Sequence, residues 1–236
     1  MPTGFTRSPK FVKGALIRLS EGFIGPVPNV ILFQYNPESI SRELKSFTGI
    51  KESPKGKGQW GEVTTSEPFD PEESFKITLE LDATDDYEKP HLNPDAIIFG
   101  VADRIAALET LLYPTGEDDI GSKISSALGT GSPVPKGRVP IVLFAWGPGK
   151  IVPVRITSFS VKEDAYSTTL YPVRATVEVG LQVLTEQAIS SLGKHGDLTE
   201  AEALALTAYK VTRTQKEVLA RKNMLNNVPL TELLPF

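Results

Sequence analysis

The chain has 236 residues, 40% of them hydrophobic and 23% charged, a composition typical of a protein that folds and buries a core. Its net charge is −4 and it has no dense block of lysine or arginine, so neither nucleic acid nor an anionic membrane surface is an expected partner. It has no cysteine, which excludes a disulfide framework, thiolate catalysis and cysteine-ligated zinc. The sequence shows no signal-peptide pattern and no membrane-spanning run, so we expect synthesis and assembly in the cytoplasm.

Apolar and polar residues alternate in several short segments of the first half, and this alternation is typical of half-buried β-strands. The segments are residues 13–19, 29–35, 40–47 and 75–82, of which the last alternates most regularly. Asn36-Pro37 lies between the second and third segments. It predicts a corner, because the residue before a proline is kept out of the helical region.

The stretch from Pro140 to Leu184 contains three further alternating runs. Gly147-Pro148-Gly149 separates the first run from the second, and Tyr171-Pro172 precedes the third. This punctuation predicts a meander of antiparallel strands. The residues expected to face one side of the sheet are Val154, Ile156 and, after a one-residue shift, Phe159 and Val161 in the second run, and Val173, Ala175, Val177 and Val179 in the third.

Three helices are predicted, one of them inside the β-rich part. Residues 95–112 follow a helix-start pattern at Asn93-Pro94 and place an apolar stripe on one face, which has to pack against the sheet. Thr199 and Glu202 have the spacing of a capping box, which predicts a helix that runs to about residue 206. Residues 214–225 predict another helix.

The expected fold is therefore mainly β, within the α+β class. We expect a β domain over residues 1–190 and a partly helical extension with a docking tail over residues 191–236. Two loops, residues 48–74 and 115–138, are rich in glycine, serine and proline and too long to be simple connections, so we predict contact roles for both. The apolar tail after residue 227 cannot form a core alone and is predicted to dock on its own domain or on another chain. The candidate interaction residues are Trp60, Phe69, Ile120, Ile124, Leu230, Leu233, Leu234 and Phe236.

The residue types that most enzymes use are scarce, because the chain has two histidines and no cysteine. Residues 56–61 match the spacing G-x-G-x-x-G, but no strand leads into them and no helix follows, so a dinucleotide site is not expected. The acidic residues from Asp82 to Glu88 lack the spacing of a calcium loop. We therefore predict no catalytic residue, no cofactor and no metal ion, and no enzymatic activity.

Several stretches, taken in order, resemble the tube-domain proteins of contractile injection systems, the phage-tail-like machines. They are Val30–Ile40 (VILFQYNPESI), Leu79–Thr84 (LELDAT), Pro140–Gly147 (PIVLFAWG) and the following hairpin with Phe159 and Tyr171–Ala175 (YPVRA). The resemblance covers about residues 11–187. It implies an antiparallel β-barrel or two-sheet sandwich with one flanking helix, and copies that assemble side by side into a hexameric ring.

The resemblance further implies a structural role, in which the ring connects the inner tube to the spike and baseplate and initiates tube assembly. Tube, spike and baseplate proteins are then the expected partners, and direct membrane insertion is not expected. The baseplate member of this family usually carries a LysM module. Tyr209-Lys210-Val211 resembles the start of one, but the Gly-Asp-Thr-Leu stretch is absent, so the tail is expected to act as a contact arm instead.

Two alternatives remain open, a repeated inner-tube subunit of the same machine and a monomeric β-sandwich that binds a small ligand or glycan. The number of rings in each particle separates the first alternative from an initiator, and native mass spectrometry separates the second. The final place of the particle, which can be cytoplasmic, membrane-attached or released, is not predicted.

Overall fold

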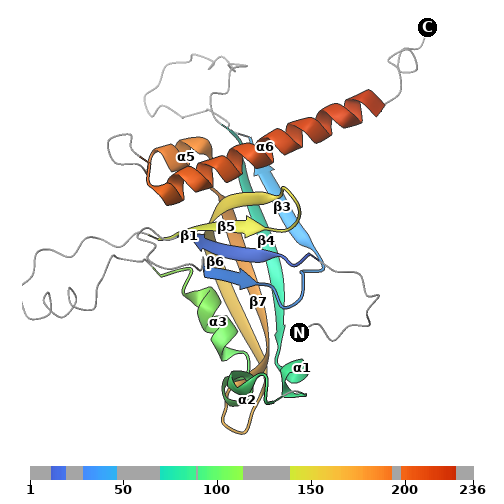
Figure 1. The fold of residues 1–236 in the computed structure, drawn as a ribbon, viewed down its shortest axis with the longest axis vertical. Helices are drawn as coiled ribbons and strands as arrows, with labels where there is room; N and C mark the ends of the chain where they lie inside the picture. Colours follow the sequence, from blue (N-terminus) through green and yellow to red (C-terminus); the bar gives the residue numbers. More distant parts are fainter. Residues whose placement is uncertain are drawn as a thin grey trace, which may run out of the picture.

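The computed structural model describes residues 12–19, 29–46, 70–88, 90–113, 139–192 and 198–226. Its strands are β1 (Ala15–Leu19), β2 (Asn29–Leu32), β3 (Ile40–Lys45), β4 (Glu72–Asp82), β5 (Ile141–Ala145), β6 (Ile151–Tyr166) and β7 (Pro172–Val183). Its helices are α1 (Thr84–Tyr87), α2 (Pro94–Phe99), α3 (Ala102–Glu109), α5 (Glu186–Ser190) and α6 (Glu200–Asn226). The strands form one antiparallel sheet in the order β2-β1-β5-β6-β7-β4-β3, which confirms a mainly β fold of the α+β class (Figure 1).

The sheet is strongly rolled around its own apolar face. Phe75 on β4 and Phe144 on β5 lie with ring centroids 5.5 Å apart, although β6 and β7 separate their strands in the sheet. Three strand spacings would place them about 14 Å apart in a flat sheet. Trp146 stacks on Phe144 with centroids 4.6 Å apart, and the Phe33 ring lies 6.4 Å from that of Phe144. The hydrophobic core therefore lies inside the roll.

The two ends of the roll approach each other without main-chain pairing. β3 pairs with β4 only from Glu72 to Ile77, so the segment Thr78–Asp82 faces β2 across a gap that we call the seam. The side-chain amide of Gln34, just after β2, crosses the seam. Its Nε2 donates to the carbonyl of Asp82 at 2.5 Å, and its Oε1 accepts from the Asp82 amide at 3.0 Å. One side chain thus takes both main-chain partners that a neighbouring strand would supply.

The predicted closed barrel or two-sheet sandwich is not what the described residues form, because they make a single open sheet. The physical reason lies in the corner after β2. Asn36 accepts from the Gly14 amide at 2.8 Å and donates to the carbonyl of Val12 at 2.9 Å, so its side chain holds the chain against the start of β1. Pro37 then leads to β3 at the opposite edge of the sheet.

The predicted single helix over residues 95–112 is wrong, because Gly100 divides it into α2 and α3. Gly100 has a φ of 59°, and a Cβ there would lie 2.1 Å from the Pro172 carbonyl oxygen. The next amide, that of Val101, donates to the same oxygen at 2.9 Å. This contact holds the end of α2 against the start of β7. The next helix, α3, buries Ile105 and Leu108 in the main hydrophobic core.

β4 departs from its predicted boundary, whereas the predicted irregularity in β6 is present. β4 begins at Glu72, so the predicted loop over residues 48–74 ends in strand. The expected one-residue shift in β6 is confirmed as a change of register between Ile156 and Ser158. Gly180 lies opposite this bulge, and a Cβ there would lie 2.2 Å from the Ser158 Oγ. The bulge and the glycine together let β6 and β7 stay paired along the bend.

The C-terminal part contains one long helix where two were predicted. α6 runs unbroken over 27 residues and crosses one end of the rolled sheet (Figure 1). Its predicted capping box is confirmed, because the Thr199 Oγ1 accepts from the Glu202 amide at 3.3 Å and the Glu202 side chain accepts from the Thr199 amide at 3.0 Å. A small second core, which includes Ile189 and Ala205, joins α5 to the first turns of α6.

Candidate interaction surfaces

The predicted contact residues lie outside the described part of the chain. The candidate residues of the two long loops and of the apolar tail fall within residues 47–69, 114–138 and 227–236. They remain predictions: Trp60, Phe69, Ile120, Ile124, Leu230, Leu233, Leu234 and Phe236. The surfaces below come from other residues.

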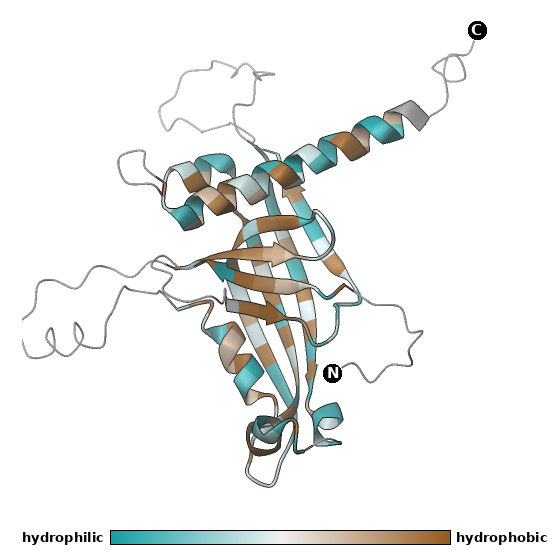
Figure 2. Cartoon of the chain, viewed as in Figure 1, coloured by the Kyte–Doolittle hydropathy of each residue, from teal (hydrophilic) through white to brown (hydrophobic). Residues whose placement is uncertain are grey.

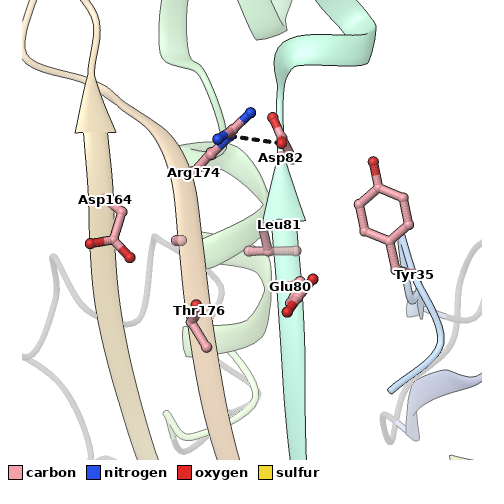
Figure 3. Close-up of a pocket in the computed structure, with 8 residues that line it drawn as sticks. Tyr35, Glu80, Leu81, Asp82, Asp164, Arg174 and Thr176 are labelled. Atoms are coloured by element: carbon pink, nitrogen blue, oxygen red, sulfur yellow. Dashed lines mark ion pairs between the residues drawn. The ribbon is translucent and has the colours of Figure 1, made fainter. Parts of the chain in front are cut away.

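A row of charges crosses the outer face of the sheet and lines a pocket of about 440 Å³ (Figure 3). Arg174 on β7 lies in register between Asp164 on β6 and Asp82 on β4. Its Nε pairs with the Asp82 Oδ2 at 2.8 Å, which is the dashed contact in Figure 3. Tyr35 stands on the far side of β4 from Asp164 and donates its hydroxyl to Asp85 at 3.0 Å.

The pKa shifts of Asp82 and Tyr35 are those expected of polar side chains that pair with one another to stabilise a fold. Partial burial alone would raise the pKa of Asp82, but hydrogen bonds from Thr84 and the positive charge of Arg174 outweigh it and lower that pKa below the ordinary value. Burial and the neighbouring Asp85 carboxylate raise the pKa of Tyr35, so its hydroxyl stays a hydrogen-bond donor. The row therefore acts as a cross-strand charge ladder on the sheet.

The two edge strands expose their side chains. β2 leaves Val30 and Leu32 exposed, and β3 is exposed along its length except for the half-buried Ile40. Leu44, near the end of β3, is half exposed. An edge strand also presents main-chain donors and acceptors that can pair with a strand of another chain. The described sheet thus offers two edges of different sequence, of which that of β2 opens onto the seam.

The middle of α6 is attached to the sheet through polar contacts. Thr212 is buried, and its Oγ1 donates to the Ile151 carbonyl at 2.6 Å and accepts from the Ile151 amide at 3.3 Å. Tyr209 donates to the Asp70 Oδ2 at 2.9 Å, and Arg213 pairs with the same oxygen at 2.8 Å. Burial, and then the Asp70 carboxylate, raise the pKa of Tyr209 well above its ordinary value.

A buried carboxylate completes this attachment and ties three elements together. Glu73 on β4 is 6% exposed and pairs with Arg42 on β3 at 2.5 Å and with Lys216 on α6 at 2.7 Å. Both cations remain partly exposed, so they stay hydrated on one side while they compensate the buried charge. α6 is thereby held to the β3–β4 edge.

Sequence reasoning missed Gln34, Glu73 and Thr212. For Glu73 a signal existed, since its position continues the buried alternation of Phe75, Ile77 and Leu79 toward the start of β4. A charged residue in that series indicates a buried partner. Gln34 and Thr212 carry no comparable local signal, because both act on main-chain atoms 48 and 61 residues away.

Within the described ranges, no three histidine, aspartate or glutamate side chains gather closely enough to hold a metal ion. None of the described helices combines the length and the apolar character needed to cross a membrane.

Comparisons with known proteins found no matching family model and no matching curated protein.

Proposed function

We propose that this protein is a structural subunit of a contractile injection system, forming a hexameric ring that connects the inner tube to the spike and baseplate and initiates tube assembly. The observation on which this proposal rests is the open sheet, whose edge strands β2 and β3 expose their side chains and differ in sequence. A closed ring needs two different, complementary surfaces on every copy. In this proposal the tail-tube-type architecture is completed only between copies, and the role is structural rather than catalytic.

The edges supply the right kind of contact for such a ring. Strand pairing across a subunit boundary satisfies the free main-chain groups of both edges. It also buries Val30 and Leu32 of one copy beside Leu44 of the next, which removes exposed apolar side chains from water. The resemblance of the ordered motifs to tube-domain proteins supports the same arrangement.

A monomeric ligand-binding module is the second candidate, and one observation favours it. A pocket of about 500 Å³ opens in the seam between β2, β4 and α3. Its most prominent cation, Arg104, already donates to Gln34 at 2.6 Å and pairs with Asp86. Trp146, the aromatic side chain that a sugar site would use, is half-buried and stacks on Phe144 in the aromatic core. These contacts make the ring the better supported function.

The ring is tested with single-cysteine versions, since the natural chain has no cysteine that could interfere. Val30→Cys and Leu44→Cys chains carrying different tags are co-expressed and treated with a short bis-maleimide. We expect cross-links between the two tags and a hexamer in native mass spectrometry. The control pair, Val30→Cys with Glu178→Cys, places the second cysteine on the central strand β7, where no edge contact is possible.

A chain that stays monomeric at every concentration, with no more edge cross-linking than the control pair, overturns the proposal. The number of copies in isolated particles then separates the two ring types. One ring in each particle identifies an initiator or adaptor, and many rings identify a repeated inner-tube subunit.

A further inference from the structure

The end of the molecule opposite α6 carries a cluster of exposed apolar side chains. It is formed by α2, the residues before it and the turn between β6 and β7 (Figures 1 and 2). We call it the tip surface; its members are Leu92, Ile97, Ile98, Phe99, Leu170 and Tyr171. Phe99 and Tyr171 are in edge-to-face contact with centroids 5.4 Å apart, which joins the helix to the turn. A contiguous exposed apolar surface of this kind is typical of a contact site.

Leu170 gives the clearest indication that the tip surface is covered by something. It lies in the left-handed region with a φ of 63°, where a residue other than glycine or asparagine is disfavoured by about 1–2 kcal/mol. It is also 80% exposed, so its apolar side chain gains nothing from the chain's own core. Hydrogen bonds within the turn, from the Leu170 amide to the Ser167 carbonyl and from the Tyr171 amide to the Ser167 Oγ, hold it there.

A second unsupported surface lies at the other end of the molecule. After Lys216, the last α6 residue that bonds to the sheet, the helix continues through residues 217–226, which we call the overhang. It extends about 15 Å at the rise of an α-helix and projects away from the sheet in Figure 1. Val218, Leu219 and Met224 are exposed along it. A helical segment of ten residues is stabilised in proteins mainly by packing of its apolar side chains, and the described residues provide no such packing for the overhang.

The charges that lack an ion-pair partner in the described part of the chain differ in sign between the two surfaces; the one carboxylate of the overhang, Glu217, pairs with Arg213 at 3.7 Å. Arg221 and Lys222 on the overhang are exposed and form no ion pair with another described residue. At the tip, Glu88, Asp95 and Glu163 are exposed and likewise form none with the described part of the chain. The charges sit beside the apolar residues at helical spacing, Asp95 three residues before Ile98 and Arg221 three residues after Val218.

From this complementarity we propose that the overhang of one copy docks on the tip surface of a second copy. The contact joins unlike surfaces at opposite ends of the molecule, so it stacks copies head to tail, roughly along the strands. A contact between a few turns of one helix and the six side chains of the tip surface is small, so it is weak for a single pair of chains. It becomes strong when several copies in one ring bind several copies in the next, because the linked contacts act together. In this respect the inference rests on the proposed ring.

The test uses two single-cysteine chains with different tags, Ile98→Cys and Val218→Cys, co-expressed as full-length protein. Under mild oxidation we expect a disulfide between the two tags. Thr78→Cys replaces Ile98→Cys in the control pair, because Thr78 is exposed on the outer face of β4, away from the tip. Circular dichroism of each chain verifies that these surface substitutions leave the fold intact.

Charge reversal then examines the electrostatic part of the contact. Arg221→Glu with Lys222→Glu in the Val218→Cys chain is expected to lower the disulfide yield at least about tenfold, because like charges then face each other. Asp95→Lys with Glu163→Lys in the partner chain is expected to restore it. A disulfide yield no higher than in the control pair, or a yield that charge reversal leaves unchanged, overturns the inference. The edge cross-links described above report the ring separately, so the loss of one contact with the other retained tells the two proposals apart.

Discussion

Replacing Thr212 by valine removes the hydroxyl that joins α6 to the first residue of β6. Valine has nearly the same shape, so the change deletes two hydrogen bonds to Ile151 without opening a large cavity. Each such bond contributes about 0.5–1.5 kcal/mol net, and the Ile151 carbonyl and amide are left without this partner. We therefore expect the free energy of unfolding to fall by about 2 kcal/mol, which for a chain of this size lowers Tm by roughly 4–8 °C.

Thr214→Val is the matched control. Its hydroxyl is exposed and donates only to the Lys210 carbonyl within the same helix, so its loss is expected to change stability by less than about 0.5 kcal/mol. Urea denaturation followed by circular dichroism measures both variants. Hydrogen exchange shows where the stability is lost. If the attachment of α6 to the sheet is weakened by about 2 kcal/mol, the exchange rates of the α6 amides rise up to about thirtyfold. Equal stability and equal exchange in the two variants would refute the reasoning that Thr212 attaches α6 to the sheet.

Three further changes examine other parts of the fold. Gly100→Ala is expected to destabilise the protein by about 3 kcal/mol or more, measured by urea denaturation, because its Cβ meets the Pro172 carbonyl and its φ is positive; a loss below 1 kcal/mol contradicts this. Glu73→Gln is expected to cost about 2 kcal/mol through its two lost ion pairs, whereas Glu72→Gln on the exposed face costs less than about 0.5 kcal/mol; similar Tm values for the two variants contradict the buried role. Folding lowers the pKa of the Asp82 carboxyl below its ordinary value of 3.8, so this group binds fewer protons in the folded chain than in the unfolded chain. Its contribution to stability is therefore present above about pH 4 and is lost as the pH falls through the lowered pKa. Asp82→Asn is therefore expected to flatten the acid limb of a stability-versus-pH curve, and an unchanged limb contradicts the assignment.

The local elements were largely predictable because local chemistry specifies them. The alternation from Phe75 to Leu81 gives the buried face of β4, and Thr199 with Glu202 gives the start of α6. The one-residue shift in β6 was also visible, since Ile156 and Phe159 can face the same side only after it. Each of these patterns lies within a few residues of sequence.

The features that were missed depend on contacts between distant residues. The roll of the sheet requires the contact of Phe75 with Phe144, which no local pattern encodes. A glycine inside an apolar stripe is often tolerated in a helix, but Gly100 breaks this one because the Pro172 carbonyl bonds to the chain there. Between the two predicted C-terminal helices, the bonds of Tyr209 to Asp70, just before β4, and of Thr212 to β6 outweigh the modest helix propensity of their residue types.

The candidate interaction surfaces show a similar division. The sequence predicts contact roles for aromatic and aliphatic residues in the long loops and in the tail, because no core is visible there for them to join. Leu170 met the same criterion, since it follows the polar turn residues Ser167–Thr169, but it lies in a short hairpin turn rather than a long loop. The overhang could not be recognised from sequence, because its exposure depends on where the sheet beneath α6 ends.

The seam has a consequence for how this architecture can change. Gln34 bridges the seam by its side chain, and Tyr35 does so beside it through Asp85, so the circumference of the roll is set there by a few side-chain contacts rather than by a ladder of main-chain bonds. A strand gained at that position, by insertion or duplication, would displace these side-chain contacts and leave every existing strand pair intact. The position of Gln34 is therefore where an added strand would enter this fold.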